Sequence, residues 1–137
     1  MALLKVFDVA GSGMSAQTTR LNTVASNLAN VNSLAGDPQQ VYRARMPVFQ
    51  SVLDRLTGNE AQVGVRIADI VAKEEQPEAL YDPSNPLADA EGYVFRSTVD
   101  PMEEMANMMS ASQSFQSNVE VLNTVKQLLL ATLRIGE

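Results

Sequence analysis

The sequence predicts a mainly α-helical chain with a small β insert, in which long N- and C-terminal helices pair as an antiparallel coiled coil. Three observations predict this fold class. Apolar residues recur at helical spacing near both ends of the 137-residue chain, five of its six prolines lie in the middle, and short β-branched runs separate those prolines. The expected units are an N-terminal helix in residues 1–34, a β-rich insert in 35–99, and a C-terminal helix in 100–137.

The N-terminal helix is expected from about residue 4 to residue 31. One row of apolar residues, spaced seven apart, is Phe7, Met14, Leu21 and Leu28, and a second row is Ala10, Val24 and Val31 with Gln17 as its polar exception. Such alternating spacing of three and four residues is typical of a coiled-coil seam. Gly11 and Gly13 each cost a helix about 1 kcal/mol relative to Ala, so a firm helix is expected only from Met14 onward.

The C-terminal helix carries a start signal, with Asp100 as N-cap, Pro101 at the first helical position, and Glu103 and Glu104 in the first turn. Its expected seam is Met105, Met108, Ser112, Phe115, Val119, Leu122, Lys126, Leu129 and Leu133. A second apolar stripe is Ala111, Val121, Val125 and Leu128. At 1.5 Å per residue, each terminal helix would be about 40 to 50 Å long.

The middle of the chain predicts short strands at residues 41–48, 63–71 and 92–95, because β-branched and aromatic residues gather there between turn formers. The apolar residues Phe49, Val52, Leu53 and Leu56 have helical spacing, which predicts a short helix after the first strand. Gly58 and Asn59 would then turn the chain.

The composition excludes several classes of function. The formal net charge of −6 argues against nucleic acid, whose binding depends on Lys and Arg, and no apolar run reaches the roughly 18 residues of a membrane span. The chain has no Cys and no His, so it lacks the usual general base and the commonest metal ligands. We therefore expect no enzyme, no cofactor, no metal and no small-molecule substrate.

The same pattern predicts partners. The C-terminal helix is apolar over more than one stripe, and the insert is expected to be too small to cover a helix about 40 Å long. Uncovered apolar helix surface favours burial against another subunit. The expected assembly interface is Phe7, Met14, Leu21, Val24, Asn27, Leu28, Asn30, Val31, Met105, Met108, Phe115, Val119, Leu122, Val125, Leu129 and Leu133.

Three segments carry a resemblance to a known family. Residues 25–33, ASNLANVNS, resemble the N-terminal signature of bacterial flagellar rod and hook proteins. Residues 85–94, NPLADAEGYV, and residues 109–126, MSASQSFQSNVEVLNTVK, resemble segments of the proximal rod proteins within that family. The opening FDVAGS of residues 7–12 and VYRA of residues 41–44 also match. Gly13 and residues 57–62 depart from the family pattern, and the resemblance otherwise covers almost the whole chain.

The resemblance implies a non-enzymatic structural subunit of the flagellar basal-body rod, which polymerises through its terminal helices and transmits torque from motor to hook. Its partners would be copies of itself, other rod proteins and the flagellar type III export apparatus. It would reach the periplasmic part of the basal body without a cleaved signal peptide. The first residues agree with that expectation, since Asp8 interrupts an apolar stretch already too short for a secretory signal.

Some residues leave alternatives open. Asn27 and Asn30 are expected to form hydrogen bonds between subunits, with a solvated helix face as the alternative. Met102, Met105, Met108 and Met109 could bind a soft metal, but adaptable interface packing is the favoured interpretation. In the loop before the second helix, Asn85, Leu87 and Tyr93 are expected contacts, with closure of the insert as the alternative.

Two other functions are compatible with some of these residues. A small helical adaptor or export chaperone could bind a partner helix in the Met-rich groove. An acid-pair hydrolase would need two facing carboxylates, for which the candidates are Asp82, Asp89, Glu91 and the pair Glu103 and Glu104. Adjacent helical residues do not face each other, and Asp is a common turn former, so the hydrolase is disfavoured.

Overall fold

The computed structural model describes residues 2–54 and 62–135 and contains two long helices with two small antiparallel sheets between them in sequence. The helices are α1 (Ala2–Ala29) and α2 (Pro101–Ile135). The strands are β1 (Leu34–Ala35), β2 (Arg45–Asp54), β3 (Gln62–Ala72), β4 (Glu78–Tyr81) and β5 (Tyr93–Arg96). The prediction of long terminal helices around a β insert is confirmed.

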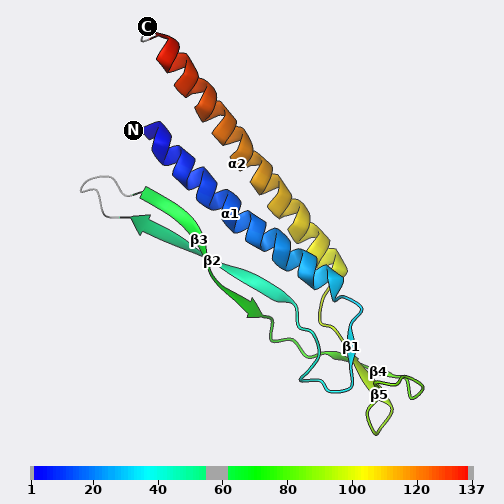
Figure 1. Ribbon diagram of the computed structural model, residues 1–137. Coiled ribbons are helices and arrows are strands. Elements are labelled where there is room, and N and C mark those ends of the chain that lie inside the picture. Colours follow the sequence, from blue (N-terminus) through cyan, green and yellow to red (C-terminus); the bar gives the residue numbers. More distant parts are fainter. Residues whose placement is uncertain (1, 55–61, 136–137) are drawn as a thin grey trace.

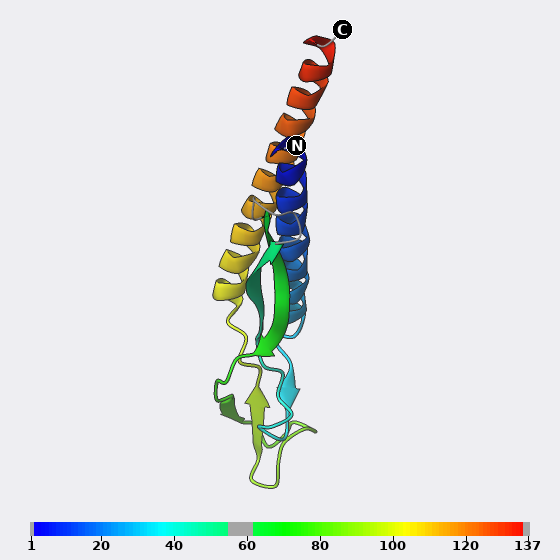
Figure 2. The same ribbon diagram turned by 90° about the vertical axis from the view of Figure 1, so that its left-hand side faces the viewer.

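The two helices lie side by side and run in opposite directions (Figures 1 and 2). With 28 and 35 residues they are about 42 and 52 Å long at 1.5 Å per residue. Both views show that the C-terminal end of α2 continues past the beginning of α1. Among the described residues, the last turns of α2 therefore have no helix beside them.

The glycines do not delay the start of α1. The helix begins at Ala2 and continues through Gly11 and Gly13, so the expectation of a firm helix only from Met14 is wrong. Tertiary packing overrides the local propensity, because α1 lies between α2 and the β2–β3 hairpin. The small size of Gly13 lets the Asn118 side chain of α2 approach, since an added Cβ would lie 3.0 Å from Asn118 Nδ2.

The start of α2 follows the predicted signals. Asp100 Oδ1 accepts a hydrogen bond from the backbone N–H of Met102 at 2.8 Å and a longer one from that of Glu103 at 3.4 Å. These N–H groups would otherwise have no partner in the first turn of a helix. Pro101 occupies the first helical position, where its missing N–H costs nothing.

Strands β2 and β3 form a long hairpin, with Arg45 opposite Ala72 at one end and Asp54 opposite Gln62 at the other. The short helix expected after the first strand is wrong, because Phe49, Val52 and Leu53 belong to β2. The ladder of hydrogen bonds to β3 outweighs their helix-like spacing, and an irregularity between Val48 and Phe49 shifts the register there. Leu56, Gly58 and Asn59 lie outside the described residues.

The hairpin packs back along α1 instead of forming a separate body at the end of the helices (Figure 1). The backbone N–H of Val65 donates to Ser12 Oγ at 3.1 Å, while Asn27 binds the backbone of Arg45. Along α1, Ser12 and Asn27 are about 22 Å apart at 1.5 Å per residue. The insert therefore covers one side of α1 over this distance, which is about half the length of the helix.

The second sheet has the order β1–β5–β4 and forms the tip farthest from the chain ends (Figure 2). Gly92 has φ of 86°, a conformation that other residues rarely adopt, and it closes the loop between β4 and β5. The segment after β1 meets that loop, because a Cβ on Gly36 would collide with the backbone oxygen of Leu87. These two glycines fix the shape of the tip.

The buried core is thin and made mostly of small side chains. Its apolar members are Ala10, Ala16, Val24, Val41, Ala44, Val94, Val99, Ala111 and Val125. Four polar residues are buried with them: Thr23, Asn27, Ser97 and Glu104. Because burial of apolar area is the main stabilising contribution to folding, small buried side chains leave this chain with limited internal stabilisation.

Candidate assembly surfaces

The most completely buried functional candidate is Asn27, whose exposed fraction is 0%. Its Nδ2 donates to the backbone oxygen of Arg45 at 2.9 Å, and its Oδ1 accepts from the backbone N–H of Arg45 at 3.0 Å. The Tyr42 hydroxyl donates to the same Oδ1 at 2.9 Å. The amide therefore acts as a local strand partner that anchors the start of β2 on α1.

The inter-subunit role expected for Asn27 does not fit this position, because its amide is enclosed and hydrogen-bonded within the chain. Asn30 is different. It is half-buried, its Nδ2 donates only to the backbone oxygen of Ser26 one turn earlier, and it lies at the edge of a cavity. The two asparagines of one motif thus have separate roles, and only Asn30 stays open to a neighbour.

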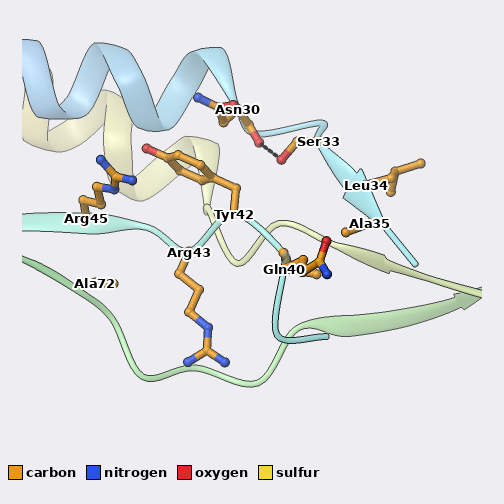
Figure 3. A pocket seen from close by; sticks show the side chains of 10 residues that line it. Asn30, Ser33, Leu34, Ala35, Gln40, Tyr42, Arg43, Arg45 and Ala72 are labelled. Carbon is orange, nitrogen blue, oxygen red and sulfur yellow. Dashed lines mark hydrogen bonds between the residues drawn. The ribbon is translucent and has the colours of Figure 1, made fainter. Parts of the chain in front are cut away.

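That cavity, of about 420 Å³, lies between the end of α1, β1 and residues 40–45 (Figure 3). Tyr42 and Arg45 stack within it, with the guanidinium carbon 5.6 Å from the ring centre, while Arg43 points away from α1. None of its lining residues is Asp, Glu, His or Cys. The cavity therefore offers no general acid or base beside a nucleophile.

The seam of α2 against α1 is only half as predicted. Its buried and half-buried residues, in alternating steps of four and three, are Glu104, Met108, Ala111, Phe115, Asn118, Leu122, Val125 and Leu129. Met108, Phe115, Leu122 and Leu129 were predicted in that seam. The other predicted positions, Met105, Ser112, Val119, Lys126 and Leu133, are each one residue or more away from the observed row.

The error has a physical cause. Two positions of the observed row hold residues that are small or polar: Ala111, which is fully buried, and Asn118, which lies against Gly13. Asn118 meets Gly13 there, where a larger apolar residue would not fit. The apolar residues Met105 and Leu133, which the sequence places in the seam, are instead exposed.

Helix α1 is covered on two sides, by α2 and by the hairpin, so its buried residues do not form a single row. Val24 is buried as predicted, and the other buried positions are Ala10, Ala16, Thr23 and Asn27. The remaining predicted residues, Phe7, Met14, Leu21, Leu28 and Val31, are half-buried. Part of the surface of each of these side chains stays accessible to a neighbouring subunit.

The contact between the helices is unusually polar. Arg20 Nη2 donates to Asn107 Oδ1 at 3.0 Å across the seam. Two buried oxygens, Gln17 Oε1 and Glu104 Oε2, have no hydrogen-bond partner among the described residues. A buried polar atom without a hydrogen bond costs about 1 to 3 kcal/mol, so these two oxygens offset part of the stabilisation that the apolar contacts of the seam provide.

A groove of about 260 Å³ opens beside this polar contact. Glu104, which is only 3% exposed, lines it together with Arg20, Phe49 and other residues of β2 and α2. Its mixture of apolar and charged groups resembles a protein interface more than a catalytic site.

Large apolar side chains remain exposed on α2 outside the seam. Met102 and Met109 are each 73% exposed, and Leu133, near the end that passes α1, is 69% exposed. Within the described residues, neither helix is apolar enough over sufficient length to cross a lipid bilayer. Such exposure is typical of a protein interaction surface.

The hairpin is a further apolar surface that the sequence-based site did not include. Its exposed members are Met46, Val48, Phe49, Val52, Val65, Ile70 and Val71. The sequence does indicate that both faces of the hairpin are apolar, since Val48 and Phe49 are adjacent and successive side chains of a strand point to opposite faces. A two-stranded ribbon with apolar residues on both faces needs cover on both.

The candidate carboxylates of a hydrolase are engaged in local structure. Asp82 Oδ1 accepts from Ser84 Oγ at 2.6 Å, and this hydrogen bond holds the pKa of Asp82 below its usual value of 3.8. Asp89 Oδ1 accepts from the backbone N–H groups of Glu91 at 2.9 Å and Tyr93 at 2.8 Å. Asp82 and Asp89 therefore form turns, as the sequence analysis expected when it disfavoured a hydrolase function.

Glu103 has a structural partner as well. Lys73 follows directly after β3, and its Nζ donates to Glu103 Oε1 at 2.6 Å. The same Nζ lies 3.9 Å from Glu75 Oε1. The hydrogen bond to Glu103 is the main cause that raises the pKa of Lys73 above its ordinary value. This pair joins the hairpin to the first turn of α2.

The loop contacts expected from sequence lie at the tip. Asn85 Oδ1 accepts from the backbone N–H of Leu87 at 3.0 Å, so its side chain shapes the loop. Leu87 is exposed, and the ring of Tyr93 packs edge-on against Tyr81 with centres 5.3 Å apart. The tip thus presents Leu87 and the two tyrosines on a rigid turn.

Comparison with known proteins decides the family. Residues 7–33 match the family described as "Flagella basal body rod protein", and residues 90–135 match "Flagellar basal body rod FlgEFG protein C-terminal". The chain is 50% identical to "Flagellar basal-body rod protein FlgC" of Escherichia coli O157:H7 and of Salmonella typhimurium, over the full length of each chain. The chain belongs to the FlgC family. A FlgC from Buchnera aphidicola subsp. Schizaphis graminum is 42% identical, again over the full length of both chains.

The segments that the two family descriptions match coincide with the terminal helices of this chain. The first lies almost entirely in α1, and the second covers β5 and α2. These relatives are named as structural rod proteins and not as enzymes. Their names do not favour the adaptor or chaperone alternative.

Proposed function

We propose that this chain is a structural subunit of the flagellar basal-body rod and that it joins other rod subunits through its terminal helices. The observation that carries the proposal is the membership of the FlgC family over the full chain. The exposed apolar residues on α2 and on the hairpin support it, because an isolated chain gains no stabilisation from them.

The proposed interface uses the half-buried and exposed sides of both helices. On α1 it comprises Phe7, Met14, Leu21 and Leu28, directly after α1 it comprises Asn30 and Val31, and on α2 it comprises Met105, Val119, Leu129 and Leu133. The seam residues Val24, Met108, Phe115, Leu122 and Val125 act indirectly, by holding the helix pair together. Asn85, Leu87 and Tyr93 form a separate contact at the tip.

In the assembly, the helices pair as an antiparallel coiled coil. The seven-residue spacing of the observed α2 seam supports this, since helices supercoil to keep such a row facing its partner. The polar seam supports rearrangement of the pair when neighbours bind. Helices of this kind are marginal in water without packing partners.

The route and role follow from the same proposal. The chain passes through the flagellar type III export apparatus without a cleaved signal peptide and assembles in the periplasmic part of the rod. There it transmits torque from motor to hook. The thin core supports export in an unfolded state, because little stabilisation has to be overcome.

Purified basal bodies test the proposal. A strain lacking its own FlgC-family protein would express either this chain or a variant without residues 129–137. We expect the full chain in the basal bodies and the variant in none, although its tip and hairpin remain folded. Equal incorporation of both, or absence of the full chain from basal bodies, would contradict the proposal.

The adaptor alternative makes a different prediction about size. An adaptor would stay a discrete dimer at every concentration, whereas a rod subunit would form larger species as its concentration rises. Sedimentation velocity over a range of concentrations separates the two.

A further inference from the structure

The start of α2 is rich in methionine. Four of the seven methionines of the chain lie within eight residues there: Met102, Met105, Met108 and Met109. The chain has no Cys, so methionine supplies its only sulfur atoms. Thiol and thioether sulfurs are the side-chain groups that oxidants such as hydrogen peroxide attack. The reaction of this chain with peroxide is therefore a reaction of its methionines, and they are concentrated on one helix.

These methionines are not equally accessible. Met102 and Met109 are each 73% exposed and Met105 is 52% exposed, whereas Met108 is half-buried in the seam with α1. Residues three and four apart are neighbours on a helix surface, so Met102, Met105 and Met109 share one side of α2. We call these three residues the methionine face.

The sulfur atoms of the methionine face are not part of what holds the fold together. None of the three side chains belongs to the buried core of the described residues. The hydrogen bond from Met102 to the N-cap Asp100 uses the backbone N–H and not the side chain. Oxidation converts an apolar thioether into a polar sulfoxide, which disrupts a protein mainly where the methionine is buried. On this face the change alters the surface and leaves the core as it is.

We propose that Met102, Met105 and Met109 form an oxidation site, at which hydrogen peroxide turns the exposed start of α2 from apolar to polar while the chain stays folded. The thioether sulfur attacks one peroxide oxygen, so that a sulfur–oxygen bond forms and the O–O bond breaks. The sulfur loses two electrons to the peroxide. The departing hydroxide takes the proton of the transferred oxygen, and the products are a sulfoxide and one water molecule.

The modification is reversible. Methionine sulfoxide reductases return the sulfoxide to the thioether, with electrons from a pair of thiols that becomes a disulfide. The oxidised face offers less apolar area to any partner, because exposed apolar area is what favours protein contacts. This inference concerns the isolated chain and goes beyond the proposed function.

Peroxide treatment of the purified full chain, followed by peptide mass spectrometry, tests the site. Susceptibility follows exposure, so we expect Met102 and Met109 to be oxidised at least about threefold faster than Met108. Met105 should lie between them. The circular dichroism and the thermal unfolding of the oxidised chain should match those of the untreated chain, because the core is unchanged.

Hydrophobic interaction chromatography of the folded chain measures the change in its surface. We expect the oxidised chain to elute earlier, and methionine sulfoxide reductases with a thiol to restore its retention. A variant with Met102→Leu, Met105→Leu and Met109→Leu keeps an apolar face without sulfur, so peroxide should change its retention far less. Met108→Leu is the matched control and should lose retention as the unsubstituted chain does.

Three results would overturn the inference. The first is oxidation of Met108 as fast as Met102 and Met109, because the chain would then be open in solution. The second is loss of helical circular dichroism on oxidation, and the third is an equal loss of retention in the triple variant. If the triple variant does not fold, Met102→Leu and Met109→Leu made singly should each remove part of the change in retention.

The proposed function is read separately. Because these measurements use the isolated chain, their failure leaves the proposed function standing. Absence of the unmodified chain from basal bodies would end the proposed function and leave the oxidation site as measured.

Discussion

Asn27 on α1 and Arg45 at the start of β2 are joined by two hydrogen bonds, in which the Asn27 amide pairs with the backbone N–H and oxygen of Arg45. Asn27 is fully buried, and its Oδ1 also accepts a hydrogen bond from the Tyr42 hydroxyl. This side chain thus anchors the start of β2 on the N-terminal helix.

Replacing Asn27 with Ala is expected to lower the free energy of unfolding by about 2 to 4 kcal/mol, because partly buried backbone groups of Arg45 lose their partners. Urea unfolding followed by circular dichroism measures the change. Asn30→Ala is the matched control, since the Asn30 side chain, directly after α1, donates to the backbone oxygen of Ser26 one turn earlier and its loss should cost less than about 1 kcal/mol. Similar losses in the two variants would contradict the anchoring role of Asn27.

The two glycines of α1 should respond differently to Ala. A Cβ on Gly11 meets no atom within 4 Å, so Gly11→Ala is expected to stabilise the chain by about 0.5 to 1 kcal/mol. A Cβ on Gly13 would press on Asn118, so Gly13→Ala should gain less or lose stability. Thermal unfolding compares them, and adding Asn118→Ala to Gly13→Ala should restore the gain. Equal effects of the two single changes would argue against the close approach of α2.

The ion pair between Lys73 and Glu103 should contribute only about 0.5 to 1 kcal/mol to the free energy of unfolding, because Glu103 is half exposed and water screens the pair. The folded pKa of Lys73 is raised above 10.5, so this stabilisation is fully present below pH 10.5 and is lost as pH rises through the folded value. Urea unfolding of Glu103→Gln should therefore show a deficit at neutral pH that shrinks above pH 10.5. Glu75→Gln is the control and should cost less, since its oxygen is 3.9 Å from Lys73. A deficit that does not change with pH would contradict this account.

At the tip, Ser84→Ala should raise the pKa of Asp82 toward its usual value, because the Ser84 hydroxyl bond is the main cause of the lowered pKa. A lowered folded pKa means that this bond stabilises the turn above pH 3.8 and is lost as pH falls through the folded value. Carboxyl ¹³C chemical shifts measured against pH report the change. Ser110→Ala, remote on α2, should leave the titration of Asp82 unchanged, and an unchanged titration in Ser84→Ala would exclude the turn as its cause.

The sequence was informative wherever one local signal dominated. The helix start at Asp100 and Pro101 follows from capping chemistry alone, and the two terminal helices follow from their periodicity. The role of Asn27 did not follow, because its partner Arg45 lies in a strand whose position depends on the whole hairpin. The α2 seam was misplaced at alternate positions for a similar reason. Gly13 and Asn118, which meet where α1 and α2 pack, carry no apolar signal of their own.

Density for the assembled rod tests the central claim most directly, namely that the terminal helices of this chain hold it in the assembly. In a map of purified basal bodies at side-chain resolution, we expect the outward residues of α2, Met105 and Leu133 among them, to be buried against neighbouring subunits. A map in which these side chains face solvent, and in which only the tip contacts its neighbours, would contradict the account.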